Sequence, residues 1–152
     1  MHPLHSAIES TKWFGENFAY NLGFIPADKL SWKPSPTAKS ALEITAHQIF
    51  GMRAMKTALT TGSLEGFGAP MPVLDSLEDA QNQIREATKT YAAWLESLSS
   101  ADLEGEIELP FGSFPRIAAA LMETQDLVHH HGQICYIQTI LGDNEDHFLP
   151  LN

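Results

Sequence analysis

Apolar residues recur at helical spacing in four stretches of the chain, and more polar segments separate these stretches. The first stretch runs from about Leu4 to Leu22, and its apolar positions lie three or four residues apart, as on one face of an α-helix. Gly23 and Pro26 then interrupt the pattern. A proline-containing connector follows, and it shows no periodicity of its own.

The second and third helices have recognisable starts. Ser40 and Glu43 form a Ser-x-x-Glu capping box, which satisfies free backbone amides at a helix N-terminus. This second helix ends in residues 60–63, and a glycine- and proline-rich loop leads to the third helix. We expect the third helix to begin after the N-cap Ser76 and to continue to about Leu98.

The segment before the last helix lacks the helical spacing of apolar residues. Residues 103–112 are rich in glutamate and predict an extended connection. The fourth helix is predicted to open at Ser113, with Pro115 in its first turn, where the missing N–H costs nothing. It continues to about Leu141 and stops at Gly142.

Four long helices in 152 residues predict an all-α fold, a four-helix bundle with long loops between its helices. We expect one domain that spans residues 1–152. The connections between the second and third helices, and between the third and fourth, are long enough for crossovers. Periodicity alone therefore leaves the order of the helices open.

Charge and cysteine content exclude several classes of function. The 19 acidic and 9 basic residues give a net charge of −10, which disfavours nucleic acids and anionic membranes as partners. The single cysteine, Cys135, rules out an intrachain disulfide and a cysteine-based zinc framework. The first residues do not resemble a signal peptide, and no apolar run has the length of a membrane span, so a cytoplasmic protein is expected.

A run of three histidines, His129 to His131, lies within the predicted fourth helix. Asp126 shares a helix face with His130, because the two are four residues apart. It also shares a face with His129, which is three residues away. One ion can therefore be reached by Asp126 with either histidine. His131 points away from Asp126 and is expected at the surface or at an interface.

His47, in the second helix, would supply a third ligand. Three protein ligands and one open position are typical of a catalytic metal site. Nitrogen with one carboxylate suits Zn²⁺, Ni²⁺ or Fe²⁺ better than Mg²⁺ or Ca²⁺. Such an ion would lower the pKa of its bound water. Glu123, one turn before Asp126, would either orient a ligand or act as a catalytic base.

Each of these residues also has an ordinary structural interpretation. A histidine at an apolar helix position is more often a hydrogen-bonded core residue than a ligand, and this holds for His47 taken alone. Asp126 taken alone is typical of a surface residue. The metal hypothesis therefore depends on His47, Asp126 and His130 meeting in space.

Several segments resemble the DinB-like (DinB/YfiT) superfamily in their order and spacing. They are residues 26–34, residues 40–47, the segment 109–113, and His130-His131-Gly132-Gln133, which is similar to the family's His-x-Gly-Gln signature. The resemblance covers nearly the whole chain and implies an up-down-down-up bundle. It also implies a divalent metal bound by His47, His130 and the residue four before His130. That residue is usually histidine, and here it is Asp126.

The superfamily includes metal-dependent thiol transferases that use bacillithiol or mycothiol, and a mycothiol-dependent maleylpyruvate isomerase. The resemblance therefore implies a divalent-metal-dependent enzyme that activates a low-molecular-weight thiol, or water, and acts on a small molecule. Zn or Ni is the favoured metal, Fe or Mn is an alternative, and a homodimer is expected. Asp126 in place of histidine supports a second hypothesis, a metal-poor, small-ligand-binding or stress-related dimeric bundle. A third is a purely structural interaction domain.

Overall fold

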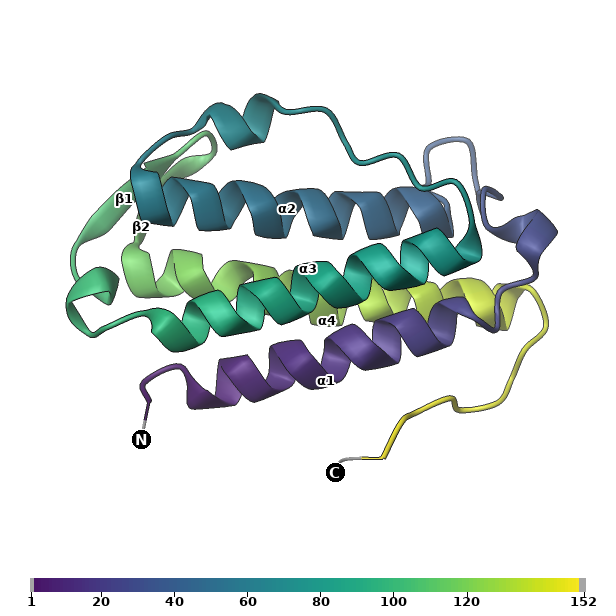
Figure 1. The fold of residues 1–152 in the computed structure, drawn as a ribbon. Coiled ribbons are helices and arrows are strands. Elements are labelled where there is room, and N and C mark those ends of the chain that lie inside the picture. Colours follow the sequence, from purple (N-terminus) through teal and green to yellow (C-terminus); the bar gives the residue numbers. More distant parts are fainter. Residues whose placement is uncertain (1, 151–152) are drawn as a thin grey trace.

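The structure is a computed structural model that describes residues 2–150, and four long helices make up most of it (Figure 1). The predicted domain also includes residues 1, 151 and 152, which lie outside the described part. The helices confirm the predicted all-α four-helix bundle, and their bounds are α1 His5–Leu22, α2 Ala41–Thr61, α3 Leu77–Ser97 and α4 Arg116–Ile140.

The helices run up, down, down and up. Figure 1 shows α1 and α4 running in one direction and α2 and α3 in the other. Both α1 and α2 pack against α3 and α4. Because α2 and α3 are parallel, residues 62–76 return along the length of the bundle, with a short 3₁₀ helix at Glu65–Gly68. This long loop is therefore a crossover, as its length allows.

The core lies where the apolar faces of the four helices meet. One fully buried side chain from each helix illustrates it: Phe18, Ile49, Ile84 and Leu127. Burying a side chain of this size contributes roughly 1.5–3 kcal/mol. The core thus fixes the relative positions of α2 and α4, on which the candidate metal ligands lie.

Both predicted N-caps are present. The Ser40 hydroxyl accepts from the amide of Glu43 at 3.3 Å, and the Glu43 carboxylate accepts from the amide of Ser40 at 2.8 Å. At the start of α3, the Ser76 hydroxyl accepts from the amide of Asp79 at 3.1 Å. These caps define where α2 and α3 begin.

The connection between α3 and α4 contains a β-hairpin that the sequence pattern did not predict. Strand β1, Glu106–Leu109, pairs antiparallel with β2, Gly112–Pro115. The prediction that the fourth helix opens at Ser113 with Pro115 in its first turn is wrong, because Pro115 is the N-cap residue and α4 begins at Arg116. A residue before proline avoids the helical region, so Phe114 favours the strand.

Within residues 2–150, no helix combines the length and the apolar character that a membrane crossing requires.

Candidate metal centre

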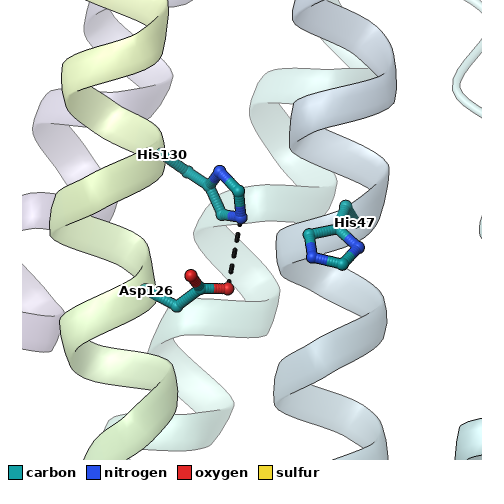
Figure 2. A group of neighbouring side chains, drawn as sticks. All are labelled: His47, Asp126 and His130. Atoms are coloured by element: carbon teal, nitrogen blue, oxygen red, sulfur yellow. Dashed lines mark ion pairs between the residues drawn. The ribbon is translucent and has the colours of Figure 1, made fainter. Parts of the chain in front are cut away.

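Three side chains from two helices converge between α2 and α4: His47 from α2, and Asp126 and His130 from α4 (Figure 2). One ligand atom of each lies within 4.8 Å of the other two. A tetrahedral ion with metal–ligand distances of about 2.1 Å holds its ligand atoms roughly 3.4 Å apart. Small side-chain rotations are therefore enough to close the three groups around one ion.

Helix geometry sets the arrangement on α4. Asp126 and His130 share a face because they are four residues apart, and Nε2 of His130 lies 3.2 Å from Oδ2 of Asp126. The rings of His47 and His130 meet edge to face, with centroids 5.1 Å apart and planes at 89°. Of the two pairings that the sequence allows, the structure brings Asp126 and His130 together with His47.

Gln133 fixes the state of the His130 ring. Its Oε1 lies 2.7 Å from Nδ1 of His130, and an amide oxygen can only accept, so Nδ1 carries the hydrogen. When the ring is neutral, its lone pair is then on Nε2, the nitrogen that faces Asp126. Metal-binding histidines commonly donate their other N–H to an oxygen in this way.

The Nε2 atom of His130 is buried and has no aligned hydrogen-bond partner among residues 2–150. A nitrogen lone pair and a carboxylate oxygen 3.2 Å apart repel each other unless a proton or a metal ion lies between them. The residues present therefore fit a divalent ion, with His47 as the third ligand. Gln133 gains a role that the sequence analysis did not assign, although its place three residues after His130 offered the signal.

Electrostatics place two of the three groups in a metal-binding form. Burial lowers the pKa of His47, and the positive charges of His130 and Lys39 lower it further. The imidazole of His130 holds the pKa of Asp126 below its usual range. Near neutral pH, His47 is thus neutral and Asp126 is charged, as a metal ligand requires.

His130 behaves differently in the absence of an ion. Burial lowers the pKa of His130, but the Asp126 carboxylate and the Gln133 oxygen more than offset this, and the net change is upward. A metal ion must therefore compete with a proton for this histidine.

Glu123 lies one turn before Asp126 and is only 7% exposed. Its Oε2 accepts a hydrogen bond from Nε2 of Gln48 at 3.3 Å. Burial and the negative charge of Asp126 raise the pKa of Glu123 to about 8. Glu123 is therefore mostly protonated at neutral pH. It does not belong to the cluster of His47, Asp126 and His130.

A cavity of about 500 Å³ opens beside the cluster, and we call it the helix cavity. Its polar wall carries His47, Glu123 and Asp126. Its apolar wall combines α2 and α4 with the crossover and the hairpin tip, through Phe50, Met55, Phe67, Phe111 and Met122. A small organic molecule with an apolar body matches this shape and chemistry.

The other two histidines of the run occupy different environments. His129 is exposed at the rim of the helix cavity and is not one of the clustered ligands. The expectation that His131 lies at the surface or at an interface is wrong, because this side chain is only 4% exposed. Its Nε2 lies 3.1 Å from Nδ2 of the buried Asn21.

The chain after α4 explains why His131 is buried. This segment folds back over α1, where the amide of Leu149 donates to Oδ1 of Asn17 at 2.8 Å. The ring of Phe148 stacks on Trp13 and also packs against His131. Long-range contacts of this kind leave no periodic signal in the sequence.

Together, these features define a class of protein: an up-down-down-up four-helix bundle with a candidate His–Asp–His metal centre between its second and fourth helices. The family model of the DinB superfamily matches residues 14–134, and the chain belongs to this superfamily. The crystal structure of a DinB-like protein from Bacillus subtilis is similar, with a TM-score of 0.77 and 20% identity over 94% of this chain and 96% of that one. That similarity establishes the fold. No curated protein matches the chain.

Proposed function

We propose that this protein is a divalent-metal-dependent enzyme that acts on a small molecule through an ion held by His47, Asp126 and His130. One observation carries the proposal: the buried Nε2 of His130 faces a carboxylate without an aligned hydrogen bond, while its Nδ1 is held by Gln133. Two nitrogens and one carboxylate favour Zn or Ni, with Fe or Mn as alternatives.

When bound, the ion would supply Lewis acidity that lowers the pKa of a thiol or of water. We favour a thiol, and thus a thiol S-transferase-like reaction, because the superfamily that the chain resembles includes thiol transferases. A hydrolase-like reaction with water uses the same ligands, since these do not distinguish a sulfur nucleophile from an oxygen one.

Residues around the proposed ion would orient a ligand, hold the substrate and donate a proton. Gln133 orients His130, and the apolar wall of the helix cavity holds the body of the substrate and excludes water. Glu123 is protonated at neutral pH because its pKa is raised to about 8. It is therefore suited to donate a proton to a leaving group in this cavity, as a general acid.

A specific contact favours the alternative function. In that alternative, the protein is a metal-poor, dimeric bundle that binds a small ligand or has a stress-related role without catalysis. Asp126 and His130 lie 3.2 Å apart, and the pKa of His130 is raised while that of Asp126 is lowered. The two groups can therefore neutralise each other with a proton in place of an ion. The helix cavity would then serve only for ligand binding.

The experiment is a metal analysis followed by an activity assay. We expect purified protein to bind one Zn²⁺ or Ni²⁺ per chain and then to accelerate thioether formation between cysteine and 1-chloro-2,4-dinitrobenzene. Chelator and His47→Ala should abolish both metal binding and the acceleration. Absence of metal binding would support the metal-poor bundle, and ester hydrolysis without thioether formation would support water as the nucleophile.

A further inference from the structure

A second cavity near the candidate metal centre differs from its neighbours in charge. It has a volume of about 610 Å³ and lies between the loop that precedes α2 and the outer face of α4, and we call it the loop cavity. It is lined by Pro34, Thr37, Ala38, Lys39, Ile44, His129, Gly132, Gln133, Tyr136 and Ile137. None of these residues is acidic, although acidic residues outnumber basic ones 19 to 9 in the chain.

The neighbouring cavities do contain carboxyl groups. Glu123 and Asp126 line the helix cavity. Glu43 lines a third cavity at the start of α2, which shares Thr37, Ala38 and Lys39 with the loop cavity, but the Glu43 carboxylate is paired with Lys33. The loop cavity instead presents hydrogen-bond donors: the ammonium of Lys39, the hydroxyls of Thr37 and Tyr136, and the imidazole of His129. Its lining is thus suited to an anion, in a protein whose net charge is −10.

Lys39 keeps its charge available for a ligand. Its side chain is exposed and forms no ion pair or hydrogen bond with any other residue between 2 and 150. Lys33, six residues earlier, contrasts with it, because its Nζ lies 2.7 Å from a carboxylate oxygen of Glu43. An anion that binds Lys39 therefore does not have to displace a protein carboxylate.

The loop cavity is continuous with the metal centre through shared residues. His129 lines both the loop cavity and the helix cavity. Gln133 lines the loop cavity and holds Nδ1 of His130. Lys39 and the candidate ligand His47 also line one cavity together, the third cavity at the start of α2, so the ammonium lies close to the metal centre.

We propose that the loop cavity binds the carboxylate of the substrate, with Lys39 as the counter-ion, so that the substrates are small organic acids. This inference rests on the proposed function, because it places the reactive atom of the same molecule at the metal centre. The hydroxyls of Thr37 and Tyr136 supply the remaining hydrogen bonds to the acid group.

The test uses Co²⁺-loaded protein and thiols matched in length that differ only in the acid group. The short pair is 3-mercaptopropionate and 3-mercaptopropan-1-ol, and the long pair is 6-mercaptohexanoate and 6-mercaptohexan-1-ol. Dissociation constants are read from the thiolate-to-cobalt absorption band. For at least one length we expect the acid to bind about tenfold more tightly than the alcohol, as one charged hydrogen bond allows.

Lys39→Gln should abolish this preference and leave the affinity for the alcohol unchanged. Lys89→Gln is the matched control, because it removes an equal charge from an exposed position on α3 in another groove, and it should keep the preference. Equal affinities for acid and alcohol at both lengths would overturn this inference but leave the proposed function standing. An equal loss of affinity for acid and alcohol in Lys39→Gln would do the same. If Co²⁺ does not bind, or binds without coordinating either thiol, the thiol-based proposed function fails and the inference fails with it.

Discussion

Gly51 of α2 stands directly against the carboxyl group of Glu123 on α4. A Cβ built on Gly51 would overlap the oxygens of this carboxyl and lie 3.0 Å from its Cδ atom. Gly51 lies one helical turn after His47, so the same face of α2 carries a candidate ligand and makes room for a buried acid. The absence of a side chain at Gly51 is what allows Glu123 to reach into the helix cavity.

Gly51→Ala should therefore destabilise the protein, even though alanine is the better helix former. Overpacking of this kind costs about 1–3 kcal/mol, and denaturant unfolding measures it. Gly132→Ala is the control, because a Cβ on Gly132 meets no atom within 4 Å. That substitution, also within a helix, should stabilise the protein by roughly 0.5–1 kcal/mol. Equal effects of the two substitutions would contradict the close contact.

The raised pKa of Glu123 predicts a dependence of stability on pH in metal-free protein. Between pH 4.5 and about 8, the folded carboxyl holds a proton that the unfolded chain releases. The free energy of unfolding should therefore fall as the pH rises through this range. Each unit of pKa difference corresponds to about 1.4 kcal/mol.

Glu123→Gln removes this proton, so its stability should decline less from pH 5 to pH 8.5 than that of the wild type. Melting temperatures in the presence of chelator measure the difference between the two curves. Parallel curves would show that Glu123 has an ordinary pKa in the folded state.

Metal binding at the cluster should raise the melting temperature. A ligand at 100 times its dissociation constant stabilises the folded state by about 2.7 kcal/mol. The Zn²⁺-induced shift should disappear in His47→Ala, Asp126→Ala and His130→Ala. His129→Ala should retain it, since His129 is exposed and is not one of the clustered groups. A shift lost only in His129→Ala would place the ion elsewhere.

Asp126→His tests the departure from the histidine that the family resemblance implies. The substitution replaces a carboxylate oxygen with an imidazole nitrogen on the same face of α4. Imidazole suits Ni²⁺ and Zn²⁺, whereas carboxylate suits Mn²⁺. Calorimetric titration should show a higher affinity for Ni²⁺ and Zn²⁺ relative to Mn²⁺. An unchanged order and ratio of affinities would mean that residue 126 does not contact the ion.

Gln133→Ala should weaken metal binding without removing a ligand. Loss of the acceptor on Nδ1 frees the ring orientation and tautomer of His130, and changes of this kind cost about 10–100-fold in metal affinity. Gln125→Ala is the matched control: Gln125 is exposed and lines the helix cavity, but it is not one of the clustered groups, so its loss should have no such effect. Gln133→Glu keeps an acceptor and should recover the affinity. Equal affinity in Gln133→Ala and the wild type would remove the role assigned to Gln133.

The sequence predicts most of the fold because the dominant signals are local. Apolar spacing locates all four helices, and the Ser40 and Ser76 caps mark two of their starts because a cap acts within one turn. The spacing of Asp126 and His130 places both on one face. Spacing alone leaves the choice between His129 and His130 open, because it depends on how α4 is rotated toward α2. The family resemblance implies His130, and the packing of the helices brings His130 to His47.

The features that the apolar spacing did not reveal depend on contacts that reach beyond one helical turn. Phe114 is a strand residue because it pairs with Ile107 across the hairpin. His131 is buried because the chain after α4 returns over it. The raised pKa of Glu123 reflects burial, which spacing alone does not measure.

The candidate ligands and the walls of the helix cavity belong to different kinds of segment. His47, Asp126 and His130 lie on helices that the core holds in register, whereas Phe67 comes from the crossover and Phe111 from the hairpin tip. Loops accept insertions and substitutions at a small entropic cost. Exchanging these two loops would therefore reshape the helix cavity while leaving the three candidate ligands in place, so the cavity and the ligand cluster can vary independently.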